Sequence, residues 1–242
     1  MTIWLALVIR HVALLLLLPM VMLLSPARAG VLDINLYPYL SDVETDSALT
    51  VNLASDLPAG WSYFGFINLY KQEGRGSLLE NPGYYSEQNL RWRFHSESAF
   101  DLSFQHNFRS GSDNDRSRLG IRWRINDSAL LGERLRAWHL RYSLTLHAKQ
   151  WDRRPESVWQ LEHSFRLDFP WLSDRLYLAG FIDHSFNESL PKGFPANPIV
   201  AEAQLGWRIR GGWYAVAEYR LNQYRRSDVN NLALGVEYRQ PF

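Results

Sequence analysis

Apolar and polar side chains alternate one by one along most of this chain. In 100–108, for example, Phe100, Leu102 and Phe104 alternate with polar residues, and the same period recurs in 89–97, 118–125, 140–147, 159–167 and 232–239. Successive side chains of a β-strand point to opposite faces, so this alternation predicts strands with one apolar face. No long stretch has the 3.6-residue period of a helix. We therefore expect an all-β protein.

The alternating segments number about twelve, and several approach the 9–11 residues that a tilted strand needs to cross a bilayer. They are 31–41, 46–55, 60–71, 87–97, 98–109, 117–126, 135–148, 157–168, 174–186, 197–209, 212–224 and 230–241. We expect an antiparallel, up-and-down transmembrane β-barrel of about twelve strands, with ten as the alternative.

The first 29 residues have the three parts of a secretory signal peptide. Arg10 and His11 precede an apolar run over 12–24, and Ala27-Arg28-Ala29 forms the cleavage motif. The run is too short for a transmembrane helix, which needs about 20 apolar residues. We expect cleavage between Ala29 and Gly30, which leaves residues 30–242 as the barrel.

Composition removes several classes of function. The chain has no cysteine, which excludes thiol catalysis and thiolate metal sites. Its net charge of +1 becomes −1 without Arg10 and Arg28, so a nucleic-acid partner is not expected. Metal-ligand spacings and phosphate-binding loops are also missing, and we expect no cofactor and no metal.

Loop lengths and aromatic residues indicate that the apolar face looks outward, toward lipid. Connections alternate between short ones (56–60, 96–98, 169–173, 210–212) and longer polar ones (71–87, 109–116, 150–157, 187–198), with 126–134 as an exception. With both termini in the periplasm, the short set is periplasmic. Two aromatic girdles are predicted, one of Trp61, Trp171, Trp213 and Tyr238, the other of Tyr70, Trp151, Trp159 and Tyr224. The last strand ends on Phe242, which resembles the ending of outer-membrane barrels that the barrel assembly machinery reads.

The polar face predicts a charged lumen. Its candidate lining residues are Arg91, Arg93, Arg118, Arg122, Arg124, Arg141, Arg166, Arg208, Arg220, Glu202, Glu218 and Glu237. A tight turn at Gly211-Gly212 would place Glu202 directly across from Arg220. These charges either fill a narrow barrel as a salt-bridge ladder or line a conduit for small, preferentially anionic solutes. We favour the conduit.

In size, strand number and arginine-rich inner face, the chain resembles small monomeric porins of Gram-negative bacteria. The oligogalacturonate-type channels are the nearer likeness and the nucleoside channels the more distant one. The resemblance is architectural and has no diagnostic motif. It implies passive transport of a small polar solute across the bacterial outer membrane, with membrane lipids and lipopolysaccharide as neighbours.

Two histidines keep a lipid hydrolase open as an alternative. His106 lies in a segment that resembles the outer-membrane phospholipase A signature, but Phe108 stands where that family has its serine and Gly120 where it has an asparagine. We expect no serine within hydrogen-bond reach of His106 on the same face. His184, beside Ser185, faintly resembles the lipid A deacylase motif, yet neighbouring residues point to opposite faces. A structural barrel with a closed lumen is the third alternative, and the sequence assigns no role to His163.

Overall fold

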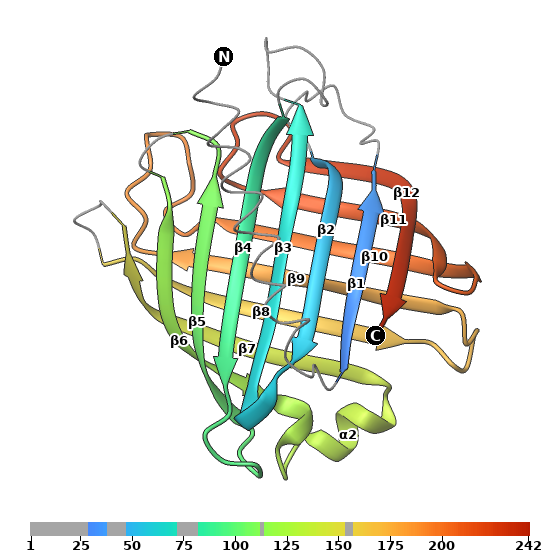
Figure 1. Ribbon diagram of the computed structural model, residues 1–242. Coiled ribbons are helices and arrows are strands. Elements are labelled where there is room, and N and C mark those ends of the chain that lie inside the picture. Colours follow the sequence, from blue (N-terminus) through green and yellow to red (C-terminus); the bar gives the residue numbers. More distant parts are fainter. Residues whose placement is uncertain (1–28, 38–46, 72–81, 112–113, 153–156) are drawn as a thin grey trace, which may run out of the picture.

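The computed structural model describes residues 29–37, 47–71, 82–111, 114–152 and 157–242, which form one closed antiparallel barrel (Figure 1). Every strand pairs with its neighbours in sequence, and β1 pairs with β12. The strands are β1 Ala29–Leu36, β2 Ser47–Asp56, β3 Trp61–Lys71, β4 Pro82–Trp92, β5 Phe100–Arg109, β6 Arg116–Arg124, β7 Leu140–Trp151, β8 Trp159–Asp168, β9 Leu176–Phe186, β10 Ile199–Arg210, β11 Trp213–Asn222 and β12 Asn230–Pro241. The predicted barrel of twelve strands is confirmed.

The barrel closes between the first and last strands. Six residue pairs, from Val31 opposite Pro241 to Leu36 opposite Val236, join β1 to β12. Two backbone hydrogen bonds between Gly30 and Phe242 extend this pairing, with N–O distances of 2.9 and 3.0 Å. In Figure 1 the strands β1–β5 stand nearly upright while β8–β11 cross behind them, as strong tilt in a closed barrel requires.

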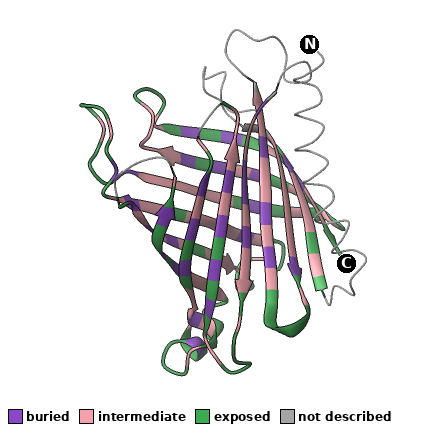
Figure 2. Ribbon diagram, turned by 60° about the vertical axis from the view of Figure 1, so that its left-hand side comes forward, coloured by how far each residue is buried: buried purple, intermediate pink, exposed green. Residues whose placement is uncertain are grey.

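The apolar face of the strands looks outward and the polar face inward. Ile121, Leu205 and Leu234 are 55%, 44% and 53% exposed, whereas Asp101, Gln105 and Glu237 are at most 1% exposed. Figure 2 shows this alternation of exposed and buried residues along individual strands. A water-soluble β-protein would show the opposite arrangement, so the barrel is built to face lipid.

The two ends of the barrel differ. The short-turn end carries the start of β1, the end of β12 and the connections 57–60, 93–99, 125–139, 169–175 and 211–212. The long-loop end carries the other connections. The predicted signal peptide lies outside the described residues except for Ala29, where β1 begins. None of the helices in the described residues is long and apolar enough to span a bilayer.

Several predicted strand boundaries were wrong. β1 ends at Leu36 and β4 at Trp92, each five residues before the predicted end. β4 starts at Pro82, not at residue 87, because it pairs with β3 from Lys71 onward. β7 starts at Leu140, not at residue 135, because the exceptional turn contains a 3-10 helix, η2 (Ile125–Asp127), and a helix, α2 (Gly132–Ala137). Asn126 anchors this turn by bonding the backbone of Leu140 and Tyr142, each at 2.7 Å. The connection between β2 and β3 is shorter and contains one 3-10 helix, η1 (Pro58–Gly60).

Candidate functional site: the charged lumen

The predicted lining arginines fall into two groups by exposure. Those within the barrel keep 10–22% of their side-chain exposure, and they are Arg91, Arg122, Arg124, Arg166 and Arg220. Arg93, Arg141 and Arg208 keep 38%, 67% and 39% and lie at the mouth of the short-turn end. The first group lines the interior, and the second group flanks one opening.

Nearly all of these arginines are paired with carboxylates. The pairs are Arg91–Glu162, Arg93–Asp101, Arg122–Asp101, Arg124–Asp101, Arg141–Asp168, Arg166–Asp168, Arg208–Asp174 and Arg220–Glu202. The register Glu202 opposite Arg220 confirms the cross-strand pair predicted from the tight turn. Arg118 differs, because it donates hydrogen bonds to the amide oxygens of Gln150 (2.8 Å) and Gln105 (2.6 Å). The lumen wall is therefore rich in charge but largely neutralised.

Several contacts join strands that are not neighbours and so cross the lumen. Arg91 on β4 reaches Glu162 on β8, with 3.6 Å between Nη2 and Oε1. Gln105 on β5 reaches the same carboxylate at 3.4 Å. His147 holds Glu162 from the next strand, with Nε2 3.2 Å from Oε2. These bridges make the lumen narrow at this level.

A second bridge surrounds Tyr177 on β9, which is 1% exposed. Its hydroxyl donates to the buried Glu237 on β12 and accepts a hydrogen bond from Gln204 at 2.5 Å. The guanidinium carbons of Arg166 and Arg239 lie 3.9 and 4.6 Å from its ring centroid. Such cation–π contacts hold both arginines in place.

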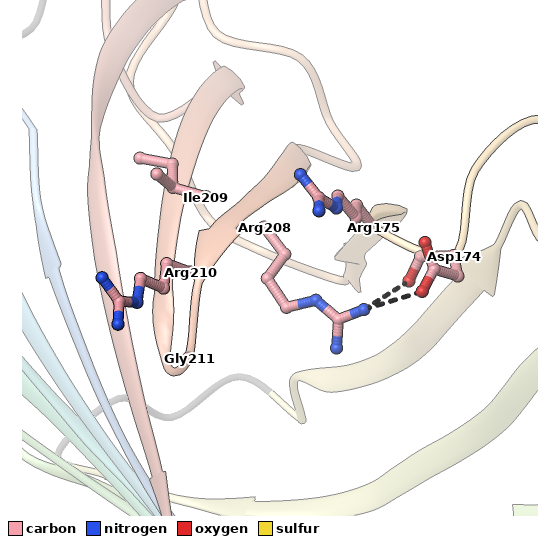
Figure 3. Close-up of a pocket in the computed structure, with 6 residues that line it drawn as sticks. All are labelled: Asp174, Arg175, Arg208, Ile209, Arg210 and Gly211. Atoms are coloured by element: carbon pink, nitrogen blue, oxygen red, sulfur yellow. Dashed lines mark hydrogen bonds and ion pairs between the residues drawn. The ribbon is translucent and has the colours of Figure 1, made fainter.

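A pocket of about 380 Å³ opens at the short-turn end and is lined by Asp174, Arg175, Arg208, Ile209, Arg210 and Gly211. Arg208 points toward Asp174, which it contacts at 3.0 Å, while Arg210 points away from it (Figure 3). The pocket belongs to the rim of the mouth and lies outside the bridged part of the lumen.

Sequence reasoning missed several inward residues. Glu87 was assigned to the edge of a loop, and Asp183, Gln105, His147 and Tyr177 were not gathered with the lining residues. Tyr177 and Asp183 share one face of β9, on which no lining residue was predicted. Glu87 and His147 share the inward parity of predicted lining residues, since Glu87 lies four residues before Arg91 on β4 and His147 six residues after Arg141 on β7. Alternation alone contained this signal, because residues two or four apart share a face.

The expectation that no serine lies near His106 was wrong. Ser117 on β6 is the cross-strand partner of His106, with 2.7 Å between Nδ1 and Oγ. His163 likewise contacts the hydroxyl of Tyr142 at 2.5 Å. His184 has Leu161 as its cross-strand partner, whereas Ser185 is buried on the inward face. His106 and His163 are thus each half of a polar pair on the outer wall.

The aromatic girdles are partly realised on the outer wall. Trp61 stacks on Trp92, with 5.9 Å between ring centroids, and Trp213 packs on Tyr238 at 4.9 Å. Tyr224 differs from the prediction, because its hydroxyl donates to Glu188 at 2.9 Å. Burial raises the pKa of Tyr224 to about 12, so the phenol stays protonated and keeps donating. In the described part of the chain, no three His, Asp or Glu side chains are placed to hold a metal ion.

Comparison with known proteins finds neither a matching family model nor a matching curated protein. Solved structures with a similar fold include a KdgM porin (13% identity, TM-score 0.48) and a KdgM porin in complex with disordered oligogalacturonate (14%, 0.49), each aligned over 87% of this chain and 98% of that one. OccK11 (OpdR) of Pseudomonas aeruginosa aligns over 87% of this chain and 63% of its own, at 14% identity and a TM-score of 0.36.

Proposed function

We propose that the protein is a narrow outer-membrane channel through which small polar solutes diffuse passively. The observation that carries this proposal is a closed barrel whose apolar side chains face outward and whose polar interior is still reached by water. At the bridge, the Arg91 and Glu162 side chains each keep 11% of their exposure, and Glu202 keeps 21%. Twelve strands lie between the eight that side chains fill and the sixteen that leave an open pore.

Reconstitution of the mature protein in a planar lipid bilayer tests this function. A channel gives discrete, uniform current steps, whereas a closed structural barrel gives none. The anion preference expected from the sequence is supported by the many lining arginines. Their pairing with carboxylates weakens that support, because a neutralised wall attracts counter-ions less strongly.

The outward apolar face also supports a proposal for where the protein resides. We propose that the exposed apolar wall faces outer-membrane lipids after export and assembly by the barrel machinery, with lipopolysaccharide at the long-loop end. Fractionation of cells on a density gradient tests this location. Recovery with the inner membrane would contradict it.

A lipid-ester hydrolase is the second candidate, and the contact between His106 and Ser117 favours it. A serine bonded to a histidine is the minimum that nucleophilic catalysis requires. Polar pairs without a nucleophile occur on the same wall, however, as Tyr142 and His163 show. Labelling by a fluorophosphonate probe decides the matter. A serine hydrolase is labelled at Ser117, and the label disappears in Ser117→Ala and His106→Ala.

A further inference from the structure

The lumen charges are sorted by depth into two layers. On β4, Glu87 precedes Arg91 by four residues, and on β8, Glu162 precedes Arg166 by four residues. Both strands run from the long-loop end to the short-turn end, so each carboxylate lies nearer the long-loop end than its arginine. Four residues span about 13 Å along a strand, or roughly 10 Å along the barrel axis, because the strands are tilted by 35–45° from that axis.

The carboxylate layer consists of Glu87, Glu162, Asp183, Glu202 and Glu218. Glu162 and Asp183 are cross-strand partners, and Glu202 and Glu218 both contact Arg220. Glu87 is linked to Glu162 through Asn89 and Gln105, and Glu202 lies on β10, the strand diametrically opposite β4. Among the arginines beside these five acids, Arg220 is the cross-strand partner of Glu202 and Arg118 is linked to Glu162 through Gln105. Arg91 reaches Glu162 from the adjoining layer.

The arginine layer consists of Arg91, Arg122, Arg124, Arg166 and Arg239. Asp101 contacts Arg122 and Arg124, while the guanidiniums of Arg166 and Arg239 both lie against the ring of Tyr177. Besides Glu162 of the carboxylate layer, five acids contact these arginines, namely Asp33, Asp101, Asp127, Asp168 and Glu237, and Arg93 and Arg141 at the mouth share three of them. Acids thus outnumber arginines in the carboxylate layer, whereas the five arginines of the other layer, taken with Arg93 and Arg141, outnumber these five acids.

Two polar groups near the boundary between the layers have no hydrogen-bond partner among the described residues and can bind water or a solute. Thr145, the cross-strand partner of Glu162, is 1% exposed, and its hydroxyl has no hydrogen-bond partner among the described residues. The Nε of Arg91 is also without a partner there. Buried polar groups are normally bonded, so these atoms indicate that a polar molecule occupies this level.

We propose that the lumen is bipolar and that it takes small zwitterionic solutes, those that carry one ammonium and one carboxylate. This inference rests on the proposed channel function. A simple anion is repelled by the carboxylate layer, and a simple cation is repelled by the arginine layer, since charged rings repel ions of like sign. A zwitterion places each of its charges against the layer of opposite sign and passes both.

A bipolar lumen conducts ions asymmetrically. When the long-loop side is positive, cations enter through the carboxylate layer and anions through the arginine layer, so both accumulate in the lumen. The opposite polarity depletes both. We expect a current ratio on the order of twofold in salt of about 0.15 M, where the Debye length of about 8 Å is close to the layer spacing, and a loss of the asymmetry at about 1 M.

Single-channel recording of the full mature protein tests the asymmetry. Because the chain has no cysteine, Lys192→Cys at the long-loop end allows an impermeant thiol reagent to report the orientation of each channel. Larger current with the long-loop side positive supports the inference. A symmetric or reversed current in dilute salt overturns it, while an absence of current steps overturns the channel function itself.

Variants separate the layers from the rest of the molecule. Glu87→Gln with Glu202→Gln should abolish the asymmetry, and Glu133→Gln, on the exposed face of α2, should leave it unchanged. If the double variant does not fold, the salt dependence of the unaltered protein still decides.

Solute flux tests the substrate class directly. Proteoliposomes should swell several-fold faster in alanine than in lactate, a solute of similar size. The swelling rate of protein-free vesicles is subtracted from each rate. Equal rates, or faster lactate entry, overturn the zwitterion assignment.

Discussion

At the scale of single residues, the outer wall shows how polar side chains are tolerated against lipid. His163 and Tyr142 satisfy each other at 2.5 Å, and His106 and Ser117 do so at 2.7 Å. An unpaired polar group in hydrocarbon is costly, so two such groups on adjacent strands are less unfavourable together than apart. The pairing also accounts for His163, to which the sequence assigned no role.

Tyr142→Phe should therefore destabilise the barrel, because it leaves the His163 ring without its partner. A loss of about 1 kcal/mol in the free energy of unfolding is expected from measured hydrogen bonds within membranes. Urea unfolding in lipid vesicles measures it. The double variant Tyr142→Phe/His163→Leu should regain most of the loss, and additive losses would show that the two residues are not coupled.

At the scale of strands and turns, alternation was enough to predict a barrel of about twelve strands and which residues of an alternating segment share a face, because parity is a local property. It did not predict the ends of β4 and β7. Pairing was predictable only where a turn fixes the register. The tight turn at Gly211-Gly212 allowed the prediction of Glu202 opposite Arg220. The contact between His106 and Ser117 spans a longer loop of unspecified geometry, and it was missed. Contacts across the lumen depend on the tilt of all twelve strands, which local sequence does not encode.

Gly120 illustrates a local constraint within one strand. It lies where the register between β6 and β7 shifts, and a Cβ added there would be 2.2 Å from the carbonyl oxygen of Leu146. Gly120→Val should therefore force the two strands apart and cost about 1–3 kcal/mol, the usual range for overpacking. The folded fraction on unboiled gels measures the effect. Ser143→Ala on β7 is the matched control, and equal folding of both variants would contradict a close approach at Gly120.

At the scale of the whole molecule, the barrel is wide enough for a pore but is narrowed by side chains that meet inside it. Twelve strands set the width of the backbone cylinder, and long charged residues reduce the space within it. The bridge between β4 and β8 and the bridge around Tyr177 join strands that the sheet itself does not connect. Conductance is thus governed by side chains more than by strand number.

Arg91→Ala should enlarge the single-channel conductance, because it removes the guanidinium that crosses from β4 to Glu162. Stability should fall by about 1–3 kcal/mol, because the mostly buried Glu162 loses one ionic partner while His147 and Gln105 still hold the carboxylate. Arg141→Ala is the matched control, because Arg141 is 67% exposed and pairs with Asp168 at the short-turn mouth. Equal conductance in both variants would place the narrowest point elsewhere, with the Tyr177 bridge as the next constriction to test. A larger conductance in Arg91→Ala alone would locate the resistance of the channel at the level of Glu162.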